Sequence, residues 1–170
     1  GYIVTGEFYS DSIDLGNGIS LNNQSSSRTY TDGMVIKLEK TELPNPTVIQ
    51  AKGIGGTSYD YINSVSETSD GGYIVGGYFD SSSIDLGNGI TIDNKGSDDG
   101  MVIKYGSSGE VEWATGIGGT SYDYINSVSE TSDGGYIVVG SFDSSSIDLG
   151  NGISLNNQSS SRTYTDGMVI

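Results

Sequence analysis

One stretch of 23 residues occurs twice in this chain without a single change. Residues 53–75 and 116–138 both read GIGGTSYDYINSVSETSDGGYIV, and the two copies start 63 residues apart. Composition bias does not produce an identical copy of that length. The stretch marks a repeat architecture, in which each unit is one small module that buries its apolar faces against its neighbours.

The repeat extends over the whole sequence when the chain is aligned with itself. Residues 1–36 return as residues 135–170 with four differences, and residues 72–103 are a more divergent third version. We therefore predict one repeat region over residues 1–170. Its units are residues 1–71, 72–134 and 135–170, and the last unit is incomplete.

The central repeat predicts four strands separated by turn residues. The runs between the turns are rich in β-branched and aromatic residues and span residues 62–67, 73–79, 101–105 and 110–114. Asp70-Gly71 lies between the first two runs and is a strong hairpin signal. The residue pattern predicts a small, buried first strand, two strands buried on both faces and a half-exposed fourth strand.

That order of burial favours an all-β fold built of β-propeller blades, each with four antiparallel strands. A closed propeller needs roughly four to eight blades, and this chain supplies about two and a half. We therefore expect a partial ring whose neighbouring blades come from the rest of a longer chain or from other protomers. An open, stacked β-repeat array is the alternative, since the repeat pattern is also compatible with it.

The charge and the missing residue types exclude several classes of function. The chain has 22 acidic and 7 basic residues, for a net charge of −15, and neither cysteine nor histidine. Such an acidic surface repels phosphate backbones and anionic lipids, which argues against nucleic-acid and membrane-surface binding. Disulfides, histidine-ligated zinc and histidine-activated nucleophiles are excluded. No apolar run approaches the ~20 residues of a membrane span, so we expect no membrane insertion.

An aromatic–acidic triplet recurs in the connection between units, at Tyr59-Asp60-Tyr61 and at Tyr122-Asp123-Tyr124. In a four-stranded blade this connection and the loop between the second and third strands leave the sheet on the same side. The tyrosines are suited to stack on sugar rings while the carboxylates bond to hydroxyl groups, so the triplets predict a carbohydrate or protein partner. In the alternative interpretation one tyrosine packs between blades and the aspartate caps amides of its own loop.

The segment SIDLGNGI occurs three times without change and places Asp14, Asp85 and Asp148 beside asparagine and backbone carbonyl groups. Calcium prefers several oxygen ligands, so Ca²⁺ binding at these aspartates is one interpretation. The other is a plain turn that closes a small extra hairpin. Residues 93–100 are also rich in oxygen ligands, but they lack the spacing of an EF-hand loop, and their acidic cluster occurs in one unit only.

Three segments of the repeat, DGMVIKYGSSGEVEW (residues 99–113), GIGGTSYDY (residues 116–124) and SVSETSDGGYIVGGYF (residues 64–79), resemble the SBBP-type bacterial β-propeller repeats. The positions that match the family pattern are Asp99-Gly100, Lys104, Gly109, Trp113, Gly118-Gly119, Asp123, Gly134-Gly135 and Gly140. The first unit departs from the pattern, because Gln50 stands where the second has Trp113. The resemblance implies propeller blades of a secreted or wall-attached surface protein, often without an assigned activity.

These observations predict a non-catalytic, extracellular segment of a bacterial surface or secreted protein, which acts as a scaffold or as a carbohydrate- or protein-binding adhesion module. A purely structural array that extends a surface appendage is the alternative. A glycan hydrolase with two catalytic carboxylates is a third interpretation. Near-identical repeats argue against an enzyme, because an active site makes its contributing residues differ between copies. A sialidase-like site would need several arginines, and the chain has only Arg28 and Arg162.

Overall fold

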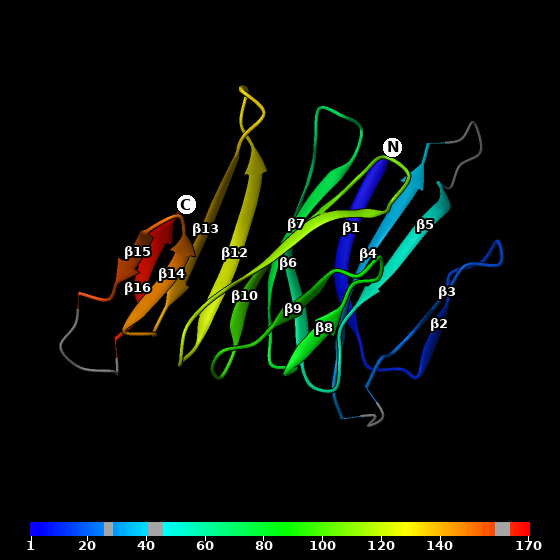
Figure 1. Ribbon diagram of the computed structural model, residues 1–170. Helices are drawn as coiled ribbons and strands as arrows, with labels where there is room; N and C mark the ends of the chain where they lie inside the picture. The colour runs from blue at the N-terminus through cyan, green and yellow to red at the C-terminus, as the bar shows by residue number, and fades with distance from the viewer. Residues whose placement is uncertain (26–28, 41–45, 159–163) are drawn as a thin grey trace.

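The computed structural model describes residues 1–25, 29–40, 46–158 and 164–170 (Figure 1). Over these ranges the chain forms strands and turns, and it contains no helix, hence none long and apolar enough to cross a membrane. The strands pair antiparallel in three larger sheets and three two-stranded hairpins. The fold is all-β, as predicted.

The middle sheet is a complete four-stranded meander. Its strands lie in the order β11-β10-β7-β6 and span Asp60–Glu67 (β6), Tyr73–Phe79 (β7), Asp99–Tyr105 (β10) and Val111–Ile117 (β11). These strands confirm the four that the sequence predicts, with bounds that differ by up to three residues. The sheet takes its first strand from the repeat of residues 1–71 and the other three from the repeat of residues 72–134.

The two flanking sheets are incomplete versions of the middle one and lie on either side of it (Figure 1). The N-terminal sheet, in the order β1-β4-β5, spans Tyr2–Phe8 (β1), Asp32–Glu39 (β4) and Thr47–Ile54 (β5). The C-terminal sheet, in the order β12-β13-β16, spans Asp123–Glu130 (β12), Tyr136–Phe142 (β13) and Asp166–Val169 (β16). By equivalence with the middle sheet, the former lacks a first strand and the latter lacks a fourth.

Strand β5 forms even though Gln50 replaces the tryptophan of the repeat. Gln50 pairs with Lys37 in the sheet register, just as Trp113 pairs with Lys104. Its side-chain amide donates to the carbonyl of Ser108 at 2.7 Å in the middle sheet. The substitution therefore exchanges an aromatic ring for a polar link between neighbouring sheets.

A small hairpin is inserted between the second and third strands of each repeat. The three hairpins span Ser12–Asp14 (β2) with Ser20–Asn22 (β3), Ser83–Asp85 (β8) with Thr91–Asp93 (β9), and Ser146–Gly150 (β14) with Ile153–Asn156 (β15). In the middle copy Gly87, Asn88 and Gly89 all have positive φ angles, of 81°, 55° and 75°. Glycine and asparagine tolerate this conformation, so the predicted Leu-Gly-Asn-Gly turn is confirmed.

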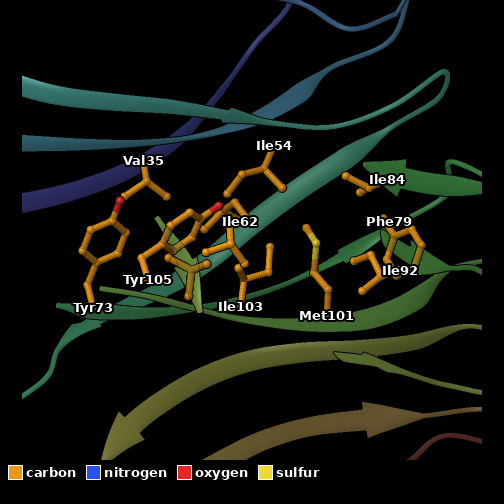
Figure 2. Close-up of a cluster of buried hydrophobic side chains, with 12 residues drawn as sticks. Val35, Ile54, Ile62, Tyr73, Phe79, Ile84, Ile92, Met101, Ile103 and Tyr105 are labelled. Atoms are coloured by element: carbon orange, nitrogen blue, oxygen red, sulfur yellow. The ribbon is translucent and has the colours of Figure 1, made fainter. Parts of the chain in front are cut away.

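Two hydrophobic clusters fill the spaces between the sheets. The first joins the N-terminal and middle sheets, and Figure 2 shows Val35 and Ile54 facing side chains of the middle sheet. Along β10, Met101 and Ile103 belong to this cluster, whereas Val102 belongs to the second cluster, against the C-terminal sheet. The second and third strands are thus buried on both faces, as predicted.

The first strand is less buried than predicted. In β6 the side chains of Asn63 and Glu67 are exposed, and four further residues are half-buried. The reason is that β6 is the edge strand of its sheet, so only one of its edges pairs with another strand. The small residues of this strand indicated close packing, but they did not indicate that one edge of the strand would have no partner strand.

Candidate functional site

Asp60 and Asp123 of the repeated triplets are fully buried and serve their own loops. The Asp60 carboxylate accepts hydrogen bonds from the Gly56 amide at 2.8 Å and from the hydroxyl and amide of Ser81 at 2.7 and 3.3 Å. Asp123 repeats this arrangement with Gly119 and Ser144. Both carboxylates therefore cap loop amides, and the tyrosines beside them, rather than the carboxylates, face the surface.

A backbone link beside each of these aspartates joins neighbouring sheets. The amide of Asp60 donates to the carbonyl of Thr31 at 2.9 Å, and the amide of Asp123 donates to that of Asp98 at 2.8 Å. Each link brings two buried aspartates from consecutive sheets close together. The first link does so for Asp32 and Asp60, and the second for Asp99 and Asp123. Sequence analysis placed Asp99 in the oxygen-rich segment of residues 93–100 but did not predict its burial beside Asp123, and it assigned no role to Asp32.

The buried aspartates have unfavourable electrostatics. Asp99 accepts one hydrogen bond, from the Lys95 amide at 2.9 Å, and its other oxygen has no partner. Burial, together with repulsion from Asp123, raises the pKa of Asp99 to about 6. Burial also raises the pKa of Asp60 to about 6, despite its hydrogen bonds. Each charge is therefore held in the interface between sheets at a cost in free energy.

We expect the protein to become more stable as the pH falls from about 7.5 to about 5. The folded-state pKa of Asp60 and Asp99 lies above the ordinary value of 3.8, so the folded state takes up protons that the unfolded state does not. The gain should be about 1 kcal/mol for each carboxyl, measured by urea unfolding at the two pH values. At lower pH the stability should fall again. The pKa of Asp70 is lowered in the folded state, chiefly by its hydrogen bond with Lys104, so the unfolded state takes up a proton at Asp70 more readily than the folded state does.

The double variant Asp60→Asn/Asp99→Asn tests the origin of this pH dependence. It should show a much smaller difference in unfolding free energy between the two pH values, whatever its absolute stability. The matched control is Asp85→Asn/Asp148→Asn, which removes the same number of charges from exposed turns. A pH dependence that persists in the first variant would mean that the general relief of negative charge, not these two sites, is responsible.

The proposed calcium ligands lie in the turns of the small hairpins. The carboxylate of Asp85 accepts the amide of Gly87 at 2.9 Å, and Asp14 and Asp148 do the same with Gly16 and Gly150. Asp85 and Asp148 each line a cavity that also contains a lysine, Lys52 and Lys95 respectively. These lysines already supply positive charge there. Across the described ranges no three acidic side chains are grouped to hold a metal, and calcium binding at these aspartates stays a prediction.

The tyrosines of the triplets form part of a continuous row, which we call the tyrosine ladder. Its members are Tyr30, Tyr59, Tyr61, Tyr78, Tyr124 and Tyr122, in that order, with successive ring centroids 4.6 to 6.5 Å apart. Successive rings are either stacked or edge-to-face, which are the favourable geometries for aromatic pairs. The ladder thus crosses from the N-terminal sheet to the C-terminal sheet.

Tyr78 connects the two triplets and was missed by sequence reasoning. It stacks on Tyr61, its partner in the β6–β7 register, at 4.8 Å and meets the edge of Tyr124 at 4.6 Å. The Tyr124 hydroxyl in turn donates to Asp98 at 3.1 Å. The position of Tyr78 opposite Tyr61 in a predicted hairpin was the available signal. The two arginines weighed for a sialidase-like site lie outside the described residues.

No protein-family model matches this sequence, and a search of curated proteins found no match either. The function is therefore inferred from the site and its surroundings.

Proposed function

We propose that this chain is a non-catalytic, extracellular β-propeller segment of a bacterial surface or secreted protein, and that it binds carbohydrate or protein along the tyrosine ladder. The resemblance to SBBP-type repeats supports the location and the fold. The four-stranded meander of the middle sheet and the face-to-face packing of three successive sheets support the blade architecture.

The outer faces of the flanking sheets support further blades on both sides. Ile137 is 45 % exposed in the C-terminal sheet, whereas its equivalent Ile74 in the middle sheet is fully buried. Tyr2 of the N-terminal sheet is 55 % exposed, and its equivalent Tyr73 is 1 % exposed. Exposed apolar faces of this kind are typical of contact surfaces, and a neighbouring blade of a longer chain or of another protomer would cover them. An open stacked array would cover them in the same way.

The ladder is the observation that carries the binding function. Six tyrosines in contact form a row that is partly exposed, and Tyr122 at its end is 48 % exposed. Tyrosine presents a large flat apolar surface together with a hydroxyl that forms hydrogen bonds, which suits sugar rings and protein contacts alike. Core packing alone does not require the ring of Tyr122 to stay exposed.

A glycan array tests the proposal, with the double variant Tyr59→Ala/Tyr122→Ala as the key comparison. We expect the wild-type protein to bind a defined set of glycans and the variant to bind them about tenfold to a hundredfold more weakly, because two ring contacts are lost. The control Tyr2→Ala removes an exposed tyrosine from the far end of β1 and should bind normally. If neither glycans nor proteins bind through the ladder, the purely structural array becomes the better interpretation.

A further inference from the structure

The second strand of each sheet has one residue that faces the tyrosine ladder, and this residue differs between the three repeats. This position is Glu7 in the N-terminal sheet, Tyr78 in the middle sheet and Ser141 in the C-terminal sheet. Between the middle and C-terminal sheets, Tyr78 packs against Tyr124 of the next sheet. Between the N-terminal and middle sheets, Glu7 stands in the equivalent place beside Tyr61, the equivalent of Tyr124.

A cavity opens where the tyrosine is replaced. It has a volume of about 360 Å³ and is lined by Gly6, Glu7, Tyr61, Ile62, Asn63 and Tyr78. We call it the Glu7 pocket. A tyrosine at position 7 would occupy part of this space, and the N-terminal sheet has no first strand beside Gly6 and Glu7 to border it.

The pocket combines a carboxylate with aromatic rings. Tyr61 and Tyr78 are stacked at 4.8 Å and form one wall, while Glu7 supplies the only charge among the lining residues. Burial is the main cause of the raised pKa of Tyr78, and the negative charge of Glu7 adds to it. Aromatic faces beside a carboxylate attract a cation through both the ring quadrupole and the ion pair.

We propose that the Glu7 pocket binds the protonated amine of an amino sugar in a glycan that lies along the tyrosine ladder. The inference rests on the binding function proposed above and specifies its ligand. The cation follows from Glu7, the two rings and a net charge of −15. The sugar follows from the ladder, which continues beyond the pocket on both sides and offers successive flat rings to successive sugar units. A lysine side chain of a protein partner would use the pocket alone.

Calorimetric titration with three tetrasaccharides at about pH 6 tests this assignment, because the amine is protonated there and the charge is the only intended variable. The probes are β-1,4-linked tetramers of glucosamine, N-acetylglucosamine and glucose. We expect the glucosamine tetramer to bind at least about tenfold more tightly than the other two, and its affinity to fall as salt is added.

Two substitutions locate the amine. Glu7→Gln should weaken binding of the glucosamine tetramer about tenfold and leave the neutral tetramers unaffected. Glu7→Tyr, which restores the residue of the middle sheet, should fill the pocket and remove the preference for the amine. Glu39→Gln removes an exposed carboxylate at the opposite end of the same sheet and should change nothing.

The outcomes separate this inference from the function on which it rests. Equal affinity for the three tetramers, or no effect of Glu7→Gln, would overturn the amine assignment. If binding of the neutral tetramers is then still lost in Tyr59→Ala/Tyr122→Ala, the ladder remains a glycan-binding surface. If no tetramer binds but a lysine-containing peptide does, in a manner that depends on Glu7, the amino-sugar assignment is wrong and the pocket serves a protein partner. Absence of any binding overturns both proposals.

Discussion

Replacing Gly77 by alanine is expected to destabilise the protein by about 3 kcal/mol or more. A Cβ atom at this position would lie 1.9 Å from the backbone carbonyl oxygen of Tyr61 and 3.0 Å from the Cα of Ile62. Gly77 sits beside the irregularity in the β6–β7 register between Ile62 and Ser64, where the two backbones approach closely. Because the obstructing atoms belong to the main chain, the clash is relieved only by moving a strand. Urea unfolding followed by circular dichroism measures the loss.

The repeat supplies a matched control for this substitution. Gly140 is the equivalent residue in the C-terminal sheet, and a Cβ there would lie 2.1 Å from the carbonyl oxygen of Tyr124, so Gly140→Ala should also be strongly destabilising. Gly6 is the equivalent residue in the N-terminal sheet, which has no first strand. Its nearest obstruction is the terminal methyl group of Met34 at 3.1 Å, so Gly6→Ala should cost little. Equal effects of all three substitutions would contradict the described approach of the backbones.

Replacing Ile74 by alanine should cost about 3 kcal/mol, whereas Ile137→Ala should cost less than about 1 kcal/mol. The two isoleucines occupy the same position of the repeat and have the same neighbours in sequence. Ile74 is fully buried in the cluster between the middle and C-terminal sheets, and its removal leaves a cavity there. Ile137 lies on the outer face of the C-terminal sheet and is 45 % exposed, so its truncation removes few contacts. Urea unfolding of both variants under identical conditions makes the comparison.

The second half of this comparison also reports on assembly. If Ile137→Ala costs as much as Ile74→Ala, the outer face is covered in solution, which contradicts the exposure described here. Sedimentation at several protein concentrations would then show whether another copy of the chain covers it. If Ile137→Ala has a small effect and the protein is a monomer, the outer face of the C-terminal sheet is free to pack against a neighbouring blade that is not present in the sample.

The tight turns illustrate what local sequence specifies well. Ser69-Asp70-Gly71-Gly72 was predicted as a turn, and in the structure Gly71 has a φ of 82° and the Asp70 carboxylate accepts the amide of Gly72 at 2.9 Å. The whole arrangement is completed within a few residues, so the sequence contains all of the interacting groups. The strand pattern behaves in the same way, because the alternation of side chains along a strand is a property of the backbone itself.

The candidate site shows the limit of the same reasoning. Asp99 and Asp123 lie 24 positions apart in sequence, and only the backbone link between Asp98 and Asp123 brings their carboxyl groups together. The tyrosine ladder likewise depends on Tyr78, whose two ring neighbours come from its own sheet and from the next. The triplets therefore indicated that aromatic rings would gather on this face, but not which rings touch, and they left open whether the aspartates would bind a ligand or cap their own loops.

By itself, the sequence determined the repeat, the four strands of the unit, the turns between them and the burial of the second and third strands on both faces. Each of these depends on residue type and on spacing within a few positions. Only the tertiary structure decided which copies of a repeated residue are buried, as Ile74 and Ile137 show, and which boundary between sheets holds the Glu7 pocket. The physical reason is that identical residues have identical local preferences, whereas their contacts depend on the neighbouring sheet. Glu7 lines a pocket at one boundary, whereas its equivalent Tyr78 packs against Tyr124 at the other.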